Sequence, residues 1–457
     1  MAAEHVYRYR HASTLTIDRG LALATAGGRA EHPFFFRGFV ERADQAAAAL
    51  LAIAEVARTR YFDAGAAARM RDPVVTSNVS VLRFEAFSAC NGVYARFDID
   101  ADGLDGELVD WGTTNVDVGD ALRAALAGVR RHDPLRLSVG DDEVVVESLD
   151  GAVVERKVPL PERWLRGFAE AQIASADMLQ VAELAAPAAR RTLRDLPRQR
   201  TGNRAMFLQP AVGGIRLSRQ AASGAASLVG PQRLSAFQRV LPFVESLTVT
   251  APAPRRRIAM AGRTSSEDSL VPTAWTAHLR HARLTLVVSP ELYRGFSGEG
   301  GVLDALVDAD SELATALGDA LAGQATLEPA ALGSRHGCSE ATVVTALRVL
   351  GATGRVGHDG ATDAYFHRDL PFDRAPLDAT QPRLLKAREL VADNAVRRRD
   401  GAGADVIGEV VSDDTVYTVR QTADGATCTC AWFAKHRGER GPCAHVLAAR
   451  LAAVRAT

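Results

Sequence analysis

The spacing of hydrophobic residues changes several times along this chain. Over residues 41–61, Ala, Leu and Ile recur at helical spacing between charged positions, which predicts an amphipathic helix. From about residue 74 to residue 158 the period becomes two, and Gly-Asp-Asp and Asp-Gly turns separate the later runs. This stretch predicts an antiparallel meander, with helices near residues 118–131 and 161–182.

An arginine-rich run marks the next part of the chain. Between residues 187 and 204, six arginines occur with a single acidic residue, Asp195. Such a run is either a solvent-exposed helix face or linker, or a contact for phosphate groups, and the exposed face is the simpler interpretation. Short strands are then expected at residues 205–208, 214–218, 247–251, 257–261 and 284–288.

Residues 302–372 predict three helices followed by a hairpin. A helix near residues 303–322 and a segment at 327–335 precede an apolar helix for which Ser339 is a good N-cap. Two short strands then flank a turn at Asp359-Gly360. This order of elements resembles a winged helix-turn-helix domain.

The charges of this winged-helix-like part bear on whether it reads DNA. A recognition helix presents side chains that reach bases and phosphates, but the outward positions here carry one arginine and one glutamate. Asp359 and Asp363 add negative charge to the hairpin, where they would repel phosphate. Direct DNA reading and a structural or protein-contact role both stay open, and the charges favour the second. The outward positions are Glu340, Ala341, Thr342, Thr345, Ala346 and Arg348.

Composition and charge narrow the class of protein. With 457 residues, of which 47% are hydrophobic and 24% charged, the chain has the composition of a soluble globular protein of several domains. A formal net charge of −1 means that any contact with nucleic acid must come from a local patch. Residues 1–8 show no signal peptide, and the longest apolar run, 46–54, is too short to cross a membrane. Three of the five cysteines form one cluster, which indicates a reducing compartment, so we expect a cytoplasmic protein.

The cysteine cluster near the end of the chain is the strongest chemical signal. Cys428 and Cys430 are followed after twelve residues by Cys443 and His445. Three thiolates and one imidazole complete a tetrahedral Zn²⁺ shell, which leaves no position for a substrate and therefore predicts a structural site. Residues i and i+2 of a strand point to the same side, so the first pair can bind one ion from a strand end.

The elements expected around the cluster explain how the four ligands meet. A helix is predicted over residues 383–399, and residues 406–412 and 415–421 predict a hairpin that leads towards Cys428. The last pair lies at the start of a final helix, whose N-terminus favours the thiolate of Cys443. A redox-active thiol pair is the alternative. His436 is a further possible ligand, but we expect its side chain to be solvated.

The pattern Cys-x-Cys, variable loop, Cys-x-His at the junction of a ββ unit and a helix resembles the SWIM zinc finger. Trp432, two residues after the second cysteine, fits the large apolar residue often found there. The resemblance covers about residues 380–457 and implies a bound Zn²⁺ and a role in DNA binding or protein interaction. A long α+β region before the finger is also similar to a group of uncharacterised bacterial SWIM-finger proteins.

The charge of this last segment neither requires nor excludes nucleic acid. From residue 380 onward there are twelve Lys and Arg and nine Asp and Glu, a difference of +3, which three thiolates and one Zn²⁺ reduce to about +2. Such a balance permits phosphate contacts without demanding them. The candidate contacts to nucleic acid or another partner are Arg397, Arg398, Arg399, Lys435, Arg437 and Arg440.

No motif for catalysis accompanies the metal-site motif. The P-loop, the Gly-x-Ser-x-Gly elbow and the His-Glu-x-x-His pair are absent from the sequence. The glycine-rich loop at residues 295–301 fits no phosphate-binding pattern and contains Glu299. We therefore expect a non-enzymatic zinc protein that binds a macromolecular partner, with nucleic acid favoured by the resemblance. A protein-interaction adaptor in a bacterial assembly is the alternative.

The predicted fold class is a multidomain α+β protein. We expect an antiparallel-sheet-rich N-terminal part, a β-rich middle part, a winged-helix-like part and a C-terminal ββα finger. The corresponding domains are residues 1–185, 186–301, 302–372 and 380–457.

Overall fold

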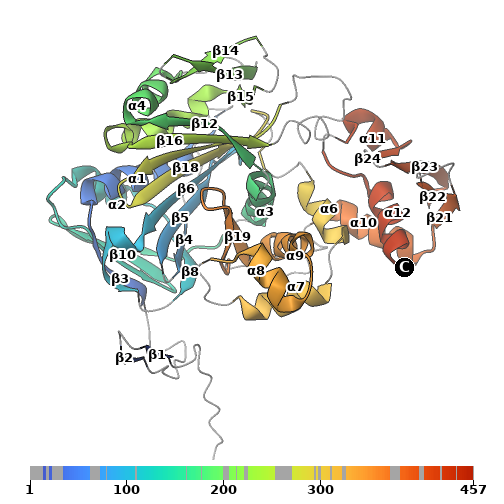
Figure 1. The fold of residues 1–457 in the computed structure, drawn as a ribbon, viewed down its shortest axis with the longest axis horizontal. Coiled ribbons are helices and arrows are strands. Elements are labelled where there is room, and N and C mark those ends of the chain that lie inside the picture. Colours follow the sequence, from blue (N-terminus) through green and yellow to red (C-terminus); the bar gives the residue numbers. More distant parts are fainter. Residues whose placement is uncertain are drawn as a thin grey trace, which may run out of the picture.

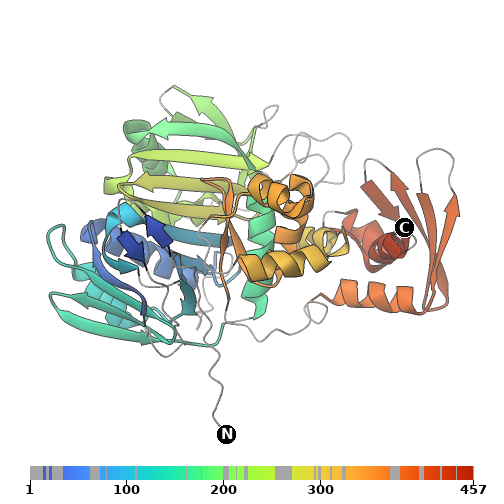
Figure 2. The same cartoon turned by 60° about the horizontal axis from the view of Figure 1, so that its bottom comes forward.

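The computed structural model places a sheet-rich body, a group of helices and a C-terminal unit along the length of the molecule (Figures 1 and 2). The C-terminal unit extends away from the body, and the helices lie between the two. The described residues are 14–16, 20–22, 34–61, 73–78, 80–108, 111–160, 162–176, 178–198, 205–212, 214–220, 225–252, 270–292, 295–296, 300–308, 311–321, 326–370, 381–400, 406–422, 425–438 and 440–455.

The largest element of the fold is an antiparallel sheet of eight strands in the order β12-β16-β17-β18-β6-β5-β4-β8. The pairing of β18 with β6, where Leu284 lies opposite Phe97, joins two groups of strands that are far apart in the sequence. The strands are β4 (Val74–Asn78), β5 (Val81–Phe87), β6 (Val93–Asp100), β8 (Gly112–Asn115), β12 (Met178–Ala185), β16 (Ser246–Pro252), β17 (Thr273–Leu279) and β18 (Ala282–Val288).

The two faces of this sheet differ because alternate residues of a strand point to opposite sides. On one face, Leu82, Phe97 and Leu284 are buried in the main hydrophobic core. Helix α1 (Ala43–Arg58) and the 3-10 segment η2 (Pro231–Arg239) contact the sheet and belong to that core. The alternate positions form what we call the polar face, and they include Thr76, Arg83, Glu85, Arg96, Asp98, Thr276, Arg283 and Thr285.

Smaller sheets surround the large one. The first has five strands in the order β11-β10-β9-β3-β7, the second has the order β14-β13-β15, and β1 pairs with β2. Helix α2 contacts α1 and β11, and α4 contacts β12 and β14. The elements are β1 (Thr14–Thr16), β2 (Gly20–Ala22), β3 (Phe34–Val40), η1 (Ala101–Gly103), β7 (Leu104–Leu108), α2 (Asp120–Gly128), β9 (Arg136–Gly140), β10 (Glu143–Ser148), β11 (Gly151–Arg156), α4 (Ala186–Asp195), β13 (Ala205–Ala211), β14 (Gly214–Ser218), β15 (Ser227–Val229) and η3 (Leu241–Phe243).

The helical part follows the predicted order of helices and hairpin. Ser339 caps α9 as expected, because its side chain accepts a hydrogen bond from the Thr342 amide at 3.2 Å. An isolated bridge pairs Leu327, before α8, with Tyr365 of the hairpin. Helix α3 contacts α9 and β19 on one side and β16 of the eight-stranded sheet on the other, so it joins this part to the sheet. The elements are α3 (Glu162–Ala176), α6 (Gly301–Asp308), α7 (Ser311–Ala320), α8 (Pro329–His336), α9 (Glu340–Ala352), β19 (Val356–Asp359) and β20 (Ala364–His367).

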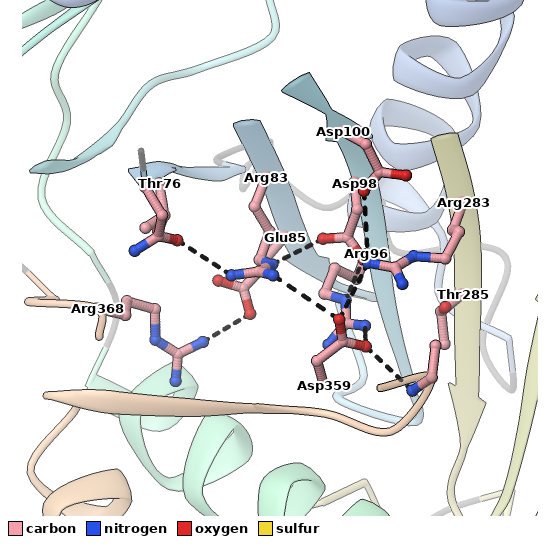
Figure 3. Close-up of polar contacts among 12 residues, drawn as sticks. Thr76, Arg83, Glu85, Arg96, Asp98, Asp100, Arg283, Thr285, Asp359 and Arg368 are labelled. Carbon is pink, nitrogen blue, oxygen red and sulfur yellow. Dashed lines mark hydrogen bonds and ion pairs between the residues drawn. The ribbon is translucent and has the colours of Figure 1, made fainter. Parts of the chain in front are cut away.

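The β19–β20 hairpin lies on the polar face and is held there by buried charges (Figure 3). Asp359 of the hairpin bonds Arg96 of the sheet and accepts a hydrogen bond from Arg283 at 3.0 Å. Asp98 accepts hydrogen bonds from Arg83 at 2.7 Å and from Arg96 at 2.9 Å. Buried ion pairs therefore bind the hairpin to this part of the sheet.

The C-terminal unit is a four-stranded antiparallel sheet in the order β21-β22-β23-β24 with helices against it. Its core also contains Leu303 and Val307 of α6, which precedes the unit in the sequence. The elements are α10 (Pro382–Ala392), β21 (Val396–Asp400), β22 (Val406–Ser412), β23 (Thr415–Thr422), β24 (Gly425–Cys428), α11 (Ala431–His436) and α12 (Ala444–Arg455).

The structure confirms the mixed class with several antiparallel sheets, and it modifies the predicted divisions. The boundary between residues 185 and 186 crosses the eight-stranded sheet, because β6 is completed by pairing with β18 from the other side of that boundary. The boundary between residues 372 and 380 separates most of α6 from the finger core in which it packs. The predicted meander is split between two sheets, since β4 to β6 and β9 to β11 take different partners.

Several predicted elements differ in type or length. The helix expected at 161–182 ends at Ala176 and a strand follows it, and the helix expected at 303–322 is described as α6 and α7. Ala346, expected to face outward, is 1% exposed in the core of the helical part. Asp359 is buried among arginines rather than exposed. The strand expected at 257–261, residues 1–8, and most of the glycine-rich loop lie outside the described residues.

Candidate metal centre

The first two cysteines of the cluster lie at the junction of a strand and a short helix. Cys428 is the last residue of β24, and Cys430 is the N-cap of α11. The Cys430 sulfur accepts a hydrogen bond from the backbone amide of Phe433 at 3.3 Å, as a capping oxygen would. The spacing of two residues thus places one thiol at the strand end and the other at a helix N-terminus.

The second pair of residues comes from the start of the last helix. Cys443 directly precedes α12, and His445 lies in its first turn. The Leu447 amide donates to the Cys443 carbonyl at 3.1 Å, so the helix begins at this cysteine. The placement confirms the expected helix start. Cys443 and His445 therefore lie on one rigid element, and the end of strand β24, which carries Cys428, can pack against it.

The four side chains converge on one point. Their ligand atoms all lie within 4.8 Å of one another, and the Cys428 sulfur is 3.8 Å from Nδ1 of His445. A tetrahedral Zn²⁺ with bonds of about 2.3 Å to sulfur and about 2.0 Å to nitrogen holds its ligands about 3.5–3.8 Å apart. All three cysteines are buried. The donor set and its spacing therefore fit Zn²⁺ in a closed site.

The cluster already favours one thiolate. Hydrogen bonding from Cys428 is the main reason that the pKa of Cys443 is lowered to about 4, with His445 and the Val446 amide acting in the same direction. The hydrogen bond to Cys443, together with burial, raises the pKa of Cys428 well above its usual range. A negative sulfur at the start of α12 is the form that a metal ligand needs.

Two side chains outside the ligand set support it. Tyr417 of β23 stacks on the His445 ring, with ring centroids 4.2 Å apart and planes 20° from parallel. Arg383 of α10 donates hydrogen bonds to the carbonyls of Arg440 and Pro442 at 2.6 and 2.8 Å, and its guanidinium lies over the Trp432 ring. Such neighbours orient metal ligands, so Arg383 fixes the loop that enters Cys443.

The finger is also tied to α6. Gly300 has φ +73° and packs so closely on the loop that a Cβ there would lie 2.7 Å from the Arg440 carbonyl. Arg450 of α12 donates to Asp304 of α6 at 2.5 Å. The metal centre therefore stabilises a surface that includes residues before the finger segment.

The predicted partner contacts fall into two groups. Arg397 is exposed on β21, while Lys435 and Arg437 are exposed at the end of α11, which follows β24. Because β21 and β24 are the two edges of the sheet, about 15 Å of sheet width separates the groups. Arg440 is half-buried, and the side chains of Arg398 and Arg399 lie outside the described residues. Arg397 also lies opposite Glu409, which lowers the local positive charge.

Some features of the site were not found by sequence reasoning. The strand β21 was predicted as the end of a helix, although Asn394, which has φ +53°, is a residue type that commonly ends helices. The short helix α11 was expected to be a loop. Nothing in the sequence marks Arg383 or Gly300, because their roles depend on contacts with the distant residue Arg440.

These features define a Cys3His zinc finger built on a β-sheet and a helix. Residues 417–453 match the family model described as the SWIM zinc finger, and the four converging ligands lie within that segment. The predicted resemblance is therefore confirmed for this part of the chain. No curated protein matches the chain.

Among solved structures, the chain is similar to Proliferating Cellular Nuclear Antigen from Entamoeba histolytica, with 10% identity and a TM-score of 0.35. It is also similar to the PCNA2-PCNA3 complex from Sulfolobus tokodaii, with 9% identity and a TM-score of 0.38. Each similarity covers 56% of this chain and 99% of the other. At these TM-scores the similarity is loose and assigns no function. No helix in the described part of the chain is long and apolar enough to cross a membrane.

Proposed function

We propose that this is a non-enzymatic zinc protein whose SWIM finger binds a macromolecular partner, and that the partner is nucleic acid. The observation that carries the proposal is the closed Cys3His group inside the segment that matches the SWIM finger. A closed shell gives zinc a structural role, so the function of the site is to shape the surface around it.

The surface next to the metal centre has features that suit phosphate contacts. Lys435 and Arg437 are exposed at the C-terminal end of α11, before the loop that leads to Cys443. Arg437 has φ +47°, a left-handed conformation that ends α11 and turns the chain at this point. Two cations held on a short, zinc-anchored segment form a local patch on an otherwise nearly neutral protein, and local patches are what a chain of net charge −1 needs for this role.

The helical part adds a second candidate surface. The order α7, the bridge at Leu327, α8, α9 and the β19–β20 hairpin resembles that of a winged helix, which supports the same class of partner. The first turn of α9 is exposed, including Glu340 and Thr342. Its charge is unfavourable for DNA, so we assign the main contact to the finger.

Salt titration of the full-length protein with a generic DNA duplex tests the proposal. Affinity should fall as salt rises, because each neutralised phosphate contributes a slope of about −0.9 in a plot of log K against log salt. The double variant Lys435→Ala with Arg437→Ala should reduce that slope by about 2. Arg130→Ala with Arg131→Ala removes the same charge from an exposed loop far along the chain and should leave the slope unchanged.

Two results would reject the nucleic-acid partner. One is the absence of binding at low salt, and the other is an affinity that does not change with salt. In either case the finger surface would be assigned to a protein partner, the adaptor role. Equal effects of the two double variants would show that binding depends on overall charge rather than on the finger.

A further inference from the structure

A cavity of about 410 Å³ lies on the polar face of the eight-stranded sheet. Strands β16, β17, β18 and β6 form its floor, Ser175 near the end of α3 lies on one side, and Gly360 and Ala361 of the hairpin turn lie on another. Cavities of about 300–1,000 Å³ are the usual size for small-molecule sites. Apart from the hairpin, the residues that line the cavity belong to strands and a helix that the proposed function does not use.

The floor of the cavity presents three threonine hydroxyl groups, each of which has a protein partner. The hydroxyls of Thr276 and Thr285 are 3.0 Å apart, and the Thr248 hydroxyl is 3.0 Å from Nε2 of His278. A hydroxyl has one donor and two acceptor positions, so each can bond a ligand while it keeps its protein partner. Thr276 and Thr285 are both buried. Buried hydroxyls that line a cavity favour a ligand with several hydrogen-bonding groups.

One buried side chain of the cavity lacks a partner. His358 of β19 is 5% exposed, and its Nδ1 has no hydrogen-bond partner among the described residues. Its Nε2 is 3.3 Å from Asp363, which leaves Nδ1 as the acceptor of the neutral ring. Burial lowers the pKa of His358 to about 4, so the ring is uncharged at neutral pH. A buried acceptor without a partner is unfavourable unless a ligand or solvent satisfies it.

The charges around the cavity are balanced. Arg96 lines it, but this guanidinium is already bound to Asp98 and Asp359 (Figure 3). Burial, assisted by Arg283, lowers the pKa of His278, so this ring too is neutral. Glu183 is exposed among the lining residues. Among the described residues that line the cavity, no positive charge is free for an anionic ligand, which would also meet the Glu183 carboxylate.

We propose that this cavity binds a neutral small molecule that carries several hydroxyl groups, either a nucleoside or a free polyol. Paired threonine hydroxyls and the acceptor of His358 would bond its hydroxyls, and the apolar side chains of Ala274 and Val287 would contact its carbon skeleton. The bound molecule would lie between the sheet and the hairpin, so its binding would also hold the hairpin in place.

Calorimetric titration of the full-length protein with four probes tests this assignment. Adenosine and uridine represent nucleosides, and glucose and myo-inositol represent polyols. Saturable binding of at least one probe is expected. Whether the nucleosides or the polyols bind then shows which of the two classes of molecule the cavity takes. AMP is the charged control and should bind at least tenfold more weakly than adenosine. Binding of none of the four neutral probes, or tighter binding of AMP than of adenosine, would overturn the proposal.

Matched variants locate the binding in the cavity. Thr276→Val with Thr285→Val removes both members of a hydrogen-bonded pair without changing their shape, a change that proteins tolerate well. It should weaken binding about tenfold or more. Thr76→Val with Thr113→Val removes an equivalent pair, 3.4 Å apart, from another part of the same sheet and should not.

A third variant covers the case in which the first double variant fails to fold. Ala274→Leu narrows the cavity from its floor and should abolish binding. Equal weakening by the two threonine double variants, or unchanged binding in Ala274→Leu, would place the ligand elsewhere and overturn the assignment.

Discussion

Replacing Asp359 with asparagine should release the β19–β20 hairpin from the sheet. Asp359 is 4% exposed and bonds Arg96 and Arg283, with Arg83 at 3.9 Å. Burial alone would raise the pKa of Asp359, but the three arginines hold it well below its usual range. The carboxylate is therefore charged at neutral pH. Asparagine keeps the size of the side chain and removes only that charge.

The size of the effect follows from the local charge count. Three arginines, two of them buried and Arg283 mostly so, share two buried carboxylates, Asp98 and Asp359, with the half-exposed Asp100 at the edge. Without Asp359, one buried carboxylate remains for three guanidinium groups. Removing one partner from a buried ion pair costs about 3–5 kcal/mol, because the remaining charge stays buried without compensation. Opening of the hairpin should therefore become between about a hundredfold and a few thousandfold more frequent.

Hydrogen exchange of hairpin peptides measures this opening directly, because local exchange reports local free energies of opening. Asp363→Asn is the matched control. It lies in the same hairpin turn, its side chain is 86% exposed, and its φ of +50° suits asparagine as well as aspartate. Exposed substitutions of this kind change stability by about 0.5 kcal/mol or less. Peptides from β22 and β23 of the finger should exchange equally in both variants.

The reasoning would be refuted if Asp359→Asn and Asp363→Asn gave hairpin exchange rates within about threefold of each other. Such a result would mean that other contacts hold the hairpin, among them the Arg368–Glu85 ion pair and the hydrogen bond from Asn78 to the His367 carbonyl. Arg83, for example, lies with its guanidinium 3.5 Å from the centre of the Phe366 ring, a contact that asparagine would leave intact.

Three further predictions concern the metal, the finger interface and pH. Cys443→Ser should lose about one zinc per chain and loosen the finger, whereas Cys338→Ser in the helical part should keep its zinc. Metal analysis measures the zinc content of both variants, and full zinc in Cys443→Ser would contradict the ligand set. Gly300→Ala should lower the melting temperature more than Gly337→Ala. Both glycines have positive φ, but a Cβ at residue 300 would meet the Arg440 carbonyl, whereas nothing lies within 4 Å of a Cβ at residue 337. Equal shifts in melting temperature would contradict the close contact between Gly300 and Arg440. Protection of the hairpin from hydrogen exchange should fall as pH drops below about 4. The pKa of Asp359 is lowered in the folded state, so its carboxylate contributes full stability only above the pKa of the unfolded chain. Exchange measured against pH should show this loss in the parent protein and not in the asparagine variant.

The features that depend on local sequence were predictable. The four zinc ligands, the capping role of Ser339 and most strands follow from spacing and residue type, which are local properties. The turn at Asp413-Asp414 is another case, because both residues have positive φ and aspartate tolerates that conformation. Each of these depends on residues within a few positions of one another, so one sequence is enough.

The features that depend on distant partners were not predictable. Alternation identifies β6 and β18 as strands but does not say that they pair, and this pairing unites two predicted domains. Asp359 looks like an exposed turn residue until Arg96, far away in the sequence, is placed beside it. The cavity has the same origin, because its hydroxyl groups come from strands whose order only the fold defines.

The docked hairpin limits how the helical part can contact a partner. A hairpin can contact a partner only with side chains that are free of the sheet, but here Asp359 and His358 are buried against it. While the hairpin stays on the sheet, exposed residues that remain for contacts include Arg335 of α8 and the first turn of α9, where Glu340 opposes phosphate. If DNA binding by the full-length protein survives Lys435→Ala with Arg437→Ala but is enhanced by Asp359→Asn, the hairpin is the contact and must leave the sheet to make it. If Asp359→Asn leaves DNA affinity unchanged, the hairpin serves to close the cavity and to join the helical part to the sheet.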